Sequence, residues 1–152
     1  MLLLGSHMRL SREAKLVSGV TLLAVPPIMY GGITLLGILT QRVAGLAPSQ
    51  LTLDETQWAL WRAGHAHAGV WVLLSLVMQM LIDSARLSTP LMWLARLSGP
   101  VAAVTVSGGF FGVAFFPAFR WLLYFGGVSL FVALVLAGVG LLRNLRAPET
   151  NT

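Results

Sequence analysis

Residues 61–83, WRAGHAHAGVWVLLSLVMQMLID, carry no Lys, Arg, Asp or Glu between Arg62 and Asp83. A helix needs about 20 apolar residues to cross the hydrocarbon core of a bilayer, and this stretch reaches that length. The segment therefore predicts a membrane-spanning helix. It also holds two imidazoles, His65 and His67. Ionisable side chains within a membrane span are rare, and those that occur there usually indicate a functional site.

Three further stretches, residues 16–41, 97–119 and 121–142, contain no Lys or Arg. The whole chain is 57% hydrophobic and 10% charged, whereas soluble domains carry about 25% charged residues. We expect an all-α fold, an integral membrane four-helix bundle. The absence of cysteine excludes disulfides, thiolate metal sites and covalent haem attachment.

The segment Gly5-Ser6-His7-Met8 is typical of the scar left by an expression tag. We therefore predict a tag remnant at 1–7, one four-span transmembrane domain at 8–146 and a disordered tail at 147–152. The basic residues divide unevenly between the two ends of the predicted spans, and the positive-inside rule then predicts that both termini are cytoplasmic. We expect a multi-pass protein of the bacterial inner membrane that contacts lipids and binds no nucleic acid. The cytoplasmic set is Arg9, Arg12, Lys15, Arg86, Arg96, Arg143 and Arg146, and the outer set is Arg42, Arg62 and Arg120.

Local signals refine the four spans. Pro26-Pro27 predicts a kink within the first span, because proline lacks an N–H donor and its ring clashes one turn back. Thr52 followed by Glu55 predicts a capping box, so that the second helix begins near Leu53 and continues to about Ser84. Pro90 suits the first turn of the third helix. We expect Gln79 and Asp83 to form a cap or an interhelix hydrogen bond.

The spacing of the two histidines limits what they can bind together. Positions i and i+2 differ by about 200° around a helix, so one regular helix cannot direct both imidazoles at one metal ion. The neighbours of the two histidines are small, and they leave room either for close helix packing or for a flat macrocycle. These neighbours are Ala63, Gly64, Ala66, Ala68 and Gly69. Arg62 lies three residues before His65 and either pairs with a haem propionate or extends to lipid headgroups.

The available ligand types favour haem over zinc. Two histidines without cysteine or an intramembrane carboxylate cannot supply the four protein ligands that zinc usually takes. Haem needs only one axial side chain, so non-covalent haem b held by His67 or His65 is the cofactor we expect. Copper held by histidine and methionine is an alternative, with candidates at Met29, Met78, Met80 and Met92.

The string WALWRAGHAHAG at 58–69 resembles the Arg-Ala-His-Ser-Gly-like motif of the styrene oxide isomerase family. In the best match His67-Ala68-Gly69 lies on His-Ser-Gly, with Arg62-Ala63 shifted by two residues, so His65 also competes for the axial role. Gly109-Phe110-Phe111 is similar to the end of the family's third helix. The resemblance implies a four-helix membrane trimer that binds haem b between subunits and converts an apolar epoxide to a carbonyl compound.

The resemblance also implies roles for individual residues. It implies that His67 or His65 is the iron ligand and that Arg62, Gly69 and Trp71 lie near the cofactor. It also implies that the substrate is a small apolar molecule from the bilayer. An apolar pocket would be lined by Trp71, Phe110, Phe111, Phe115 and Phe116. The sequence departs from the family at two polar positions, since the family's asparagine falls at Leu73 and its third-helix tyrosine at Phe111. Tyr30 or Tyr124 could replace the tyrosine from elsewhere in the fold.

Two other functions agree with the same residues. A haem-based gas sensor or electron carrier would bind the cofactor without turnover. A cofactor-free structural or transport bundle would use the histidines as hydrogen-bonding groups between helices. The sequence alone does not decide among these three functions.

Overall fold

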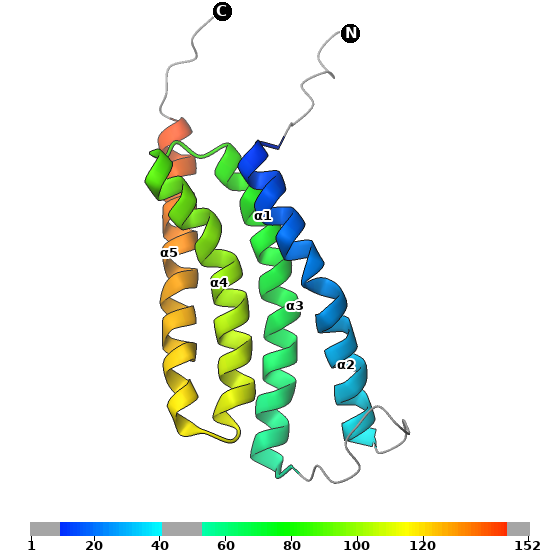
Figure 1. The fold of residues 1–152 in the computed structure, drawn as a ribbon. Coiled ribbons are helices and arrows are strands. Elements are labelled where there is room, and N and C mark those ends of the chain that lie inside the picture. Colours follow the sequence, from blue (N-terminus) through cyan, green and yellow to red (C-terminus); the bar gives the residue numbers. More distant parts are fainter. Residues whose placement is uncertain (1–9, 41–52, 146–152) are drawn as a thin grey trace, which may run out of the picture.

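The computed structural model describes residues 10–40 and 53–145, and these are helical, without strands. The predicted tag remnant, the Thr52 cap and the tail at 147–152 lie outside the described residues. The elements are α1 (Arg12–Leu23), α2 (Val25–Thr40), α3 (Glu55–Asp83), α4 (Thr89–Val113), the short 3-10 helix η1 (Pro117–Phe119) and α5 (Arg120–Leu145), as Figure 1 shows.

Four helical segments are long and apolar enough to cross a membrane: Arg12–Ile38, Glu55–Asp83, Thr89–Val113 and Pro117–Leu145. The prediction of an all-helical bundle with four candidate spans is therefore confirmed. Both ends of the described chain lie at the same end of the bundle (Figure 1). We call this the terminal end, which contains Ser11 and the α3–α4 connection. The opposite end, with Asp54 and η1, is the loop end.

The first span bends where the prolines predict it. Helix α1 ends at Leu23, Ala24 forms a turn, and α2 continues from Val25 through Pro26 and Pro27. The amide of Ala24 donates to the carbonyl of Thr21, which tightens the last turn of α1. The two proline nitrogens cannot donate, so the helical ladder is broken at this point.

Helix α3 is capped two residues later than the cap expected at Thr52. Its N-cap is Asp54, whose carboxylate accepts a hydrogen bond from the amide of Gln57 at 2.8 Å. The Gln57 side chain completes the box by accepting from the amide of Asp54 at 3.0 Å. The prediction of Thr52 with Glu55 is wrong because Asp54 and Gln57 make the same reciprocal pair. The helix ends at Asp83, next to the predicted Ser84, and Pro90 lies in the first turn of α4 as predicted.

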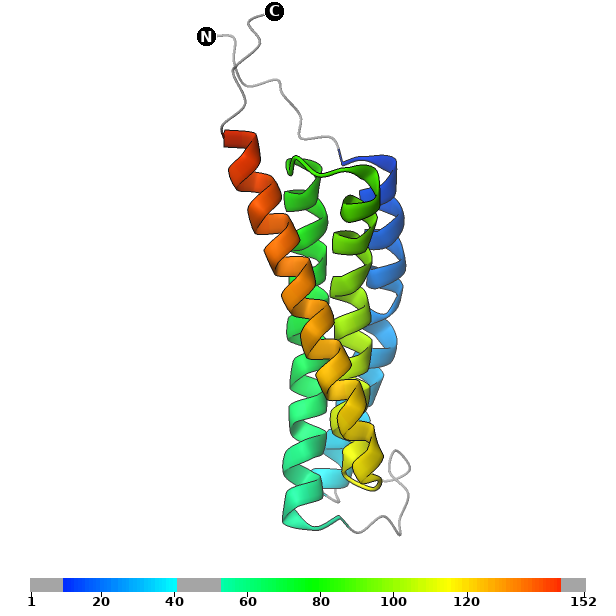
Figure 2. The ribbon, with the colours of Figure 1, turned by 90° about the vertical axis from the view of Figure 1, so that its left-hand side faces the viewer.

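Small residues allow α3, α4 and α5 to pack closely. A Cβ atom added at Gly64 of α3 would lie 3.1 Å from the backbone oxygen of Ser107 in α4. One added at Gly126 of α5 would lie 3.0 Å from the backbone nitrogen of Val106. Figure 2 shows α5 crossing the α3–α4 pair obliquely. The paired helix α1–α2 lies mainly beside α3, and the described backbone of α2 does not come close to that of α4 or α5.

A buried ionic cluster joins three helices at the terminal end. Arg96 of α4 is only 1% exposed and forms an ion pair with Asp83, the last residue of α3. Its other terminal nitrogen donates to the Gln79 side-chain oxygen at 3.2 Å. Ser11, the N-cap of α1, donates to Asp83 from its hydroxyl at 2.7 Å and from its amide at 2.8 Å. The predicted interhelix role of Gln79 and Asp83 is therefore confirmed.

Arg96 differs from its expected position. We predicted a cation beside the α3–α4 connection, but α4 begins at Thr89 and contains Arg96 within the span. Pro100, one turn later, cannot donate to the Arg96 carbonyl, and the amide nitrogen of the Gln79 side chain donates to that oxygen at 3.1 Å instead. Gln79 thus accepts from one guanidinium nitrogen and donates to the backbone oxygen that Pro100 leaves without a helical donor. The Nε atom of Arg96 is buried without a partner in the described residues.

We predict that Asp83→Leu destabilises the bundle by about 3–5 kcal/mol, because Arg96 would be left buried without a counter-charge. The double variant Asp83→Leu/Arg96→Met should recover most of that loss, since an apolar pair of similar volume replaces a buried ion pair at little cost. Thermal unfolding in detergent, followed by circular dichroism, measures both changes. If the double variant loses as much stability as the single variants Asp83→Leu and Arg96→Met lose when added together, the two residues are not a coupled pair.

Candidate functional site

The two imidazoles leave α3 on different sides, as the helical spacing predicts. A Cβ atom added at Gly32 of α2 would lie 2.7 Å from His65 Nε2, so His65 packs against α2. The His67 ring lies 4.8 Å from the Phe110 ring of α4, centroid to centroid. Both histidines are partly buried. No single ion bound within this chain can therefore take both as ligands.

His67 is held in one tautomer by its own helix. Its Nδ1 lies 2.7 Å from the carbonyl oxygen of Ala63. A carbonyl only accepts, so Nδ1 carries a proton, and in the neutral imidazole Nε2 then keeps its lone pair. Phe110 and Trp71 pack around the ring, the latter at 5.7 Å between centroids. Metal-binding histidines usually donate one N–H to a carbonyl or carboxylate in this way, which orients the ring and fixes the tautomer.

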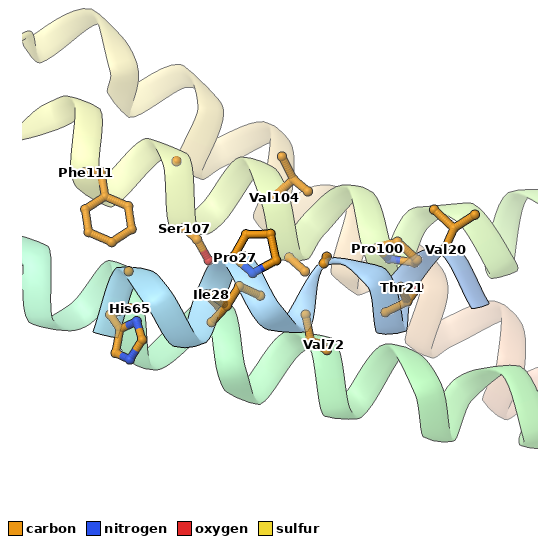
Figure 3. Close-up of a pocket in the computed structure, with 15 residues that line it drawn as sticks. Val20, Thr21, Pro27, Ile28, His65, Val72, Pro100, Val104, Ser107 and Phe111 are labelled. Carbon is orange, nitrogen blue, oxygen red and sulfur yellow. The ribbon is translucent and has the colours of Figure 1, made fainter. Parts of the chain in front are cut away.

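His65 lines a cavity bounded by α1–α2, α3 and α4, shown in Figure 3. The cavity has a volume of about 470 Å³ and is almost wholly apolar. Within the described part of the chain, neither His65 nitrogen has a hydrogen-bond partner. The lining residues from α1–α2 are Val20, Thr21, Ala24, Pro27, Ile28 and Gly31, those from α3 are His65, Ala68 and Val72, and those from α4 are Pro100, Ala103, Val104, Ser107, Gly108 and Phe111.

The other predicted site residues lie beside His67, in the cavity next to His65 or at the surface. Phe111 lines the His65 cavity, and Trp71 packs on His67. Tyr30 of α2 is 62% exposed and Tyr124 of α5 is 59% exposed. Because α2 and α5 do not pack together, these two phenols are not brought into one site within a single chain.

Arg62 and Gly69 lie nearer to the His65 side of α3 than to His67, because they precede and follow His65 by three and four residues. Arg62 is exposed near the loop end. A Cβ atom added at Gly69 would meet no neighbour within 4 Å. The cofactor neighbours that the resemblance grouped together therefore surround two different histidines.

The predicted wall of phenylalanines is not one surface. Phe110 packs on His67, whereas Phe111 contacts Trp61 edge-on at 5.7 Å on the cavity side. Phe115 and Phe116 are exposed at the loop end. The candidate copper ligands are dispersed as well, since Met78 packs in the core with Ile82, and Met29 and Met80 are exposed.

The sequence analysis missed Ser107. Its hydroxyl is buried and has no hydrogen-bond partner among residues 10–40 and 53–145. Several other helical hydroxyls donate one turn back, as Thr21 does to Val17 and Ser75 does to Trp71. The indole N–H groups of Trp61 and Trp71 are also buried without a partner in those ranges. No local pattern in the sequence marks which serine keeps its hydroxyl unpaired.

No group of three or more His, Cys, Asp or Glu side chains that could hold a metal ion occurs in the described part of the chain. No protein-family model, curated protein or solved structure matches this protein.

We predict that Gly32→Ala displaces the His65 ring, since the new Cβ would meet Nε2 at 2.7 Å. Gly31→Ala is the matched control, because a Cβ atom there meets nothing within 4 Å. Nitrogen-15 spectra of histidine-labelled protein should show shifted His65 ring resonances in Gly32→Ala only. Equal spectra for the two variants would contradict the packing of His65 against α2.

A second prediction concerns the His67 tautomer in protein prepared without added cofactor. The 2.7 Å contact with the Ala63 carbonyl requires a proton on Nδ1, so a neutral His67 ring has none on Nε2. The imidazole nitrogen-15 shifts, assigned with a His67→Gln variant, distinguish the two tautomers. A neutral His67 that is protonated on Nε2 would contradict this geometry.

Proposed function

We propose that this protein is a multi-pass membrane protein that binds haem b non-covalently through Nε2 of His67. The observation that carries the proposal is the hydrogen bond from His67 Nδ1 to the Ala63 carbonyl at 2.7 Å. It leaves Nε2 unprotonated, which is the form that ligates iron. Haem supplies four nitrogen ligands of its own, so one such imidazole is sufficient.

His65 is less suited to the axial role. Its Nε2 lies against the backbone of Gly32, so α2 covers the atom that would bind iron. The aromatic rings of Phe110 and Trp71 beside His67 suit a flat, apolar macrocycle. Among the two candidates, His67 is therefore the ligand that we propose and His65 has a different role.

The proposal includes an orientation and an assembly. We place the terminal end in the cytoplasm of a bacterium, with the chain in the inner membrane, because most Lys and Arg residues lie at that end. We also propose a homo-oligomer, a trimer by the family resemblance. Many large apolar side chains on α1, α2 and α5 are exposed in the single chain, and lipid or other copies of the chain would cover them.

Ferric haem, when bound, supplies a Lewis acid that polarises an epoxide oxygen. The apolar surroundings of His67 would exclude water. Arg62 lies on the His65 side of α3, so a propionate held by Arg62 would suit a haem on His65 better than one on His67. Tyr30 and Tyr124 are on separate, exposed helical faces. An isomerase would therefore need a phenol from another chain to orient the substrate, and we propose haem binding ahead of epoxide isomerisation. A haem sensor or electron carrier is the alternative without turnover.

We predict that the wild-type protein, purified after expression with a haem precursor, has a Soret absorption band. His67→Ala should abolish this band, because the axial bond is lost. The matched variant His65→Ala should keep it, since that ring packs on α2.

The contrary results separate the alternatives. A band that survives His67→Ala but not His65→Ala would reassign the axial ligand. A colourless wild type, despite sufficient haem, would reject the haem proposal in favour of a cofactor-free bundle.

A further inference from the structure

We propose that the cavity between α1–α2, α3 and α4 binds a small lipophilic molecule that carries one hydrogen-bonding oxygen, recognised by His65 and Ser107. This site lies on the opposite side of α3 from His67. It goes beyond haem binding and does not depend on it.

The cavity is space that the sequence leaves open. Gly31 of α2 and Gly108 of α4 both line it, and a Cβ atom added at either would meet nothing within 4 Å. Neither glycine is therefore required for close helix contact, unlike Gly64 beside Ser107. The volume of about 470 Å³ lies within the range of about 300–1,000 Å³ that is typical of small-molecule sites.

The route into the cavity leads from the bilayer. Helices α2 and α4 form two of its walls but do not pack on each other. Because almost all of the lining is apolar, a lipophilic molecule is the ligand class that this surface favours.

Two polar groups distinguish the cavity from a simple lipid groove. Ser107 is 7% exposed, its hydroxyl lacks a partner in the described ranges, and Figure 3 shows it pointing from α4 toward the cavity. His65 lines the same cavity, and because its Nε2 lies against Gly32 of α2, Nδ1 is the ring nitrogen left for a ligand. The third polar side chain, Thr21, is already bonded to the Val17 carbonyl. A ligand oxygen would satisfy groups that otherwise stay unpaired in an apolar setting.

The test uses two probes of nearly equal size, 1-naphthol and naphthalene, which differ by one hydroxyl. Binding to the full chain in lipid nanodiscs is measured by equilibrium dialysis against empty nanodiscs of the same lipid. We expect 1-naphthol to bind above the lipid background and naphthalene to bind about tenfold more weakly, because only the phenol pairs with His65 and Ser107.

Gly108→Leu should fill the cavity and remove 1-naphthol binding. Gly138→Leu on α5 is the matched control, because a Cβ atom there also meets nothing within 4 Å and the position is outside the cavity lining. Full binding in Gly108→Leu would overturn the site, as would no binding of either probe to the wild type.

Ser107→Ala tests the recognition of oxygen. It should weaken 1-naphthol binding several-fold and leave naphthalene binding unchanged. Equal affinity for the two probes, with no effect of Ser107→Ala, would overturn the proposal and leave a groove for lipid chains only. None of these readings uses haem absorption, so they succeed or fail independently of the His67 assignment.

Discussion

A guanidinium buried in a helical bundle must find its counter-charge and its hydrogen-bond acceptors in the protein, because an unpaired charge away from water is costly. Arg96 meets this constraint by joining three helices at the terminal end. It pairs with Asp83 and Gln79 of α3, and Asp83 in turn accepts both bonds from Ser11, the cap of α1. The start of the first span is therefore fixed against α3 and α4 by polar contacts, whereas α3, α4 and α5 are joined along their lengths by small residues.

The cavity follows from how the first span continues away from this cluster. The break at Ala24, Pro26 and Pro27 lies beside the cavity, and beyond it α2 packs on α3 but not on α4. Helical geometry then separates the two imidazoles. His65 meets α2 and the cavity, whereas His67 meets Phe110 and donates to its own helix. One short motif thus provides a packed, cavity-lining histidine and a second histidine in a ligand-competent tautomer.

The lengths of the uncharged stretches predicted the four candidate spans. The paired prolines predicted the kink and helix geometry predicted the divergence of His65 from His67, because both depend on local spacing. The burial of Arg96 was not predictable in the same way. In the sequence it belongs with the cations that flank spans, and only the tertiary contact with Asp83 and Gln79 explains its place within α4. The unpaired hydroxyl of Ser107 also depends on which carbonyls and side chains surround it. The cofactor and the orientation in the membrane stay predictions.

The central claim is that His67 is prepared to bind haem b. The most direct measurement is the haem content of the purified wild-type protein, determined by the pyridine haemochrome assay after expression with sufficient haem precursor. The account predicts haem b in stoichiometric amount with the polypeptide, extractable by acidified solvent because no cysteine holds it covalently. Haem far below stoichiometry under the same conditions would contradict the claim and leave the His67–Ala63 hydrogen bond as a purely structural feature of α3.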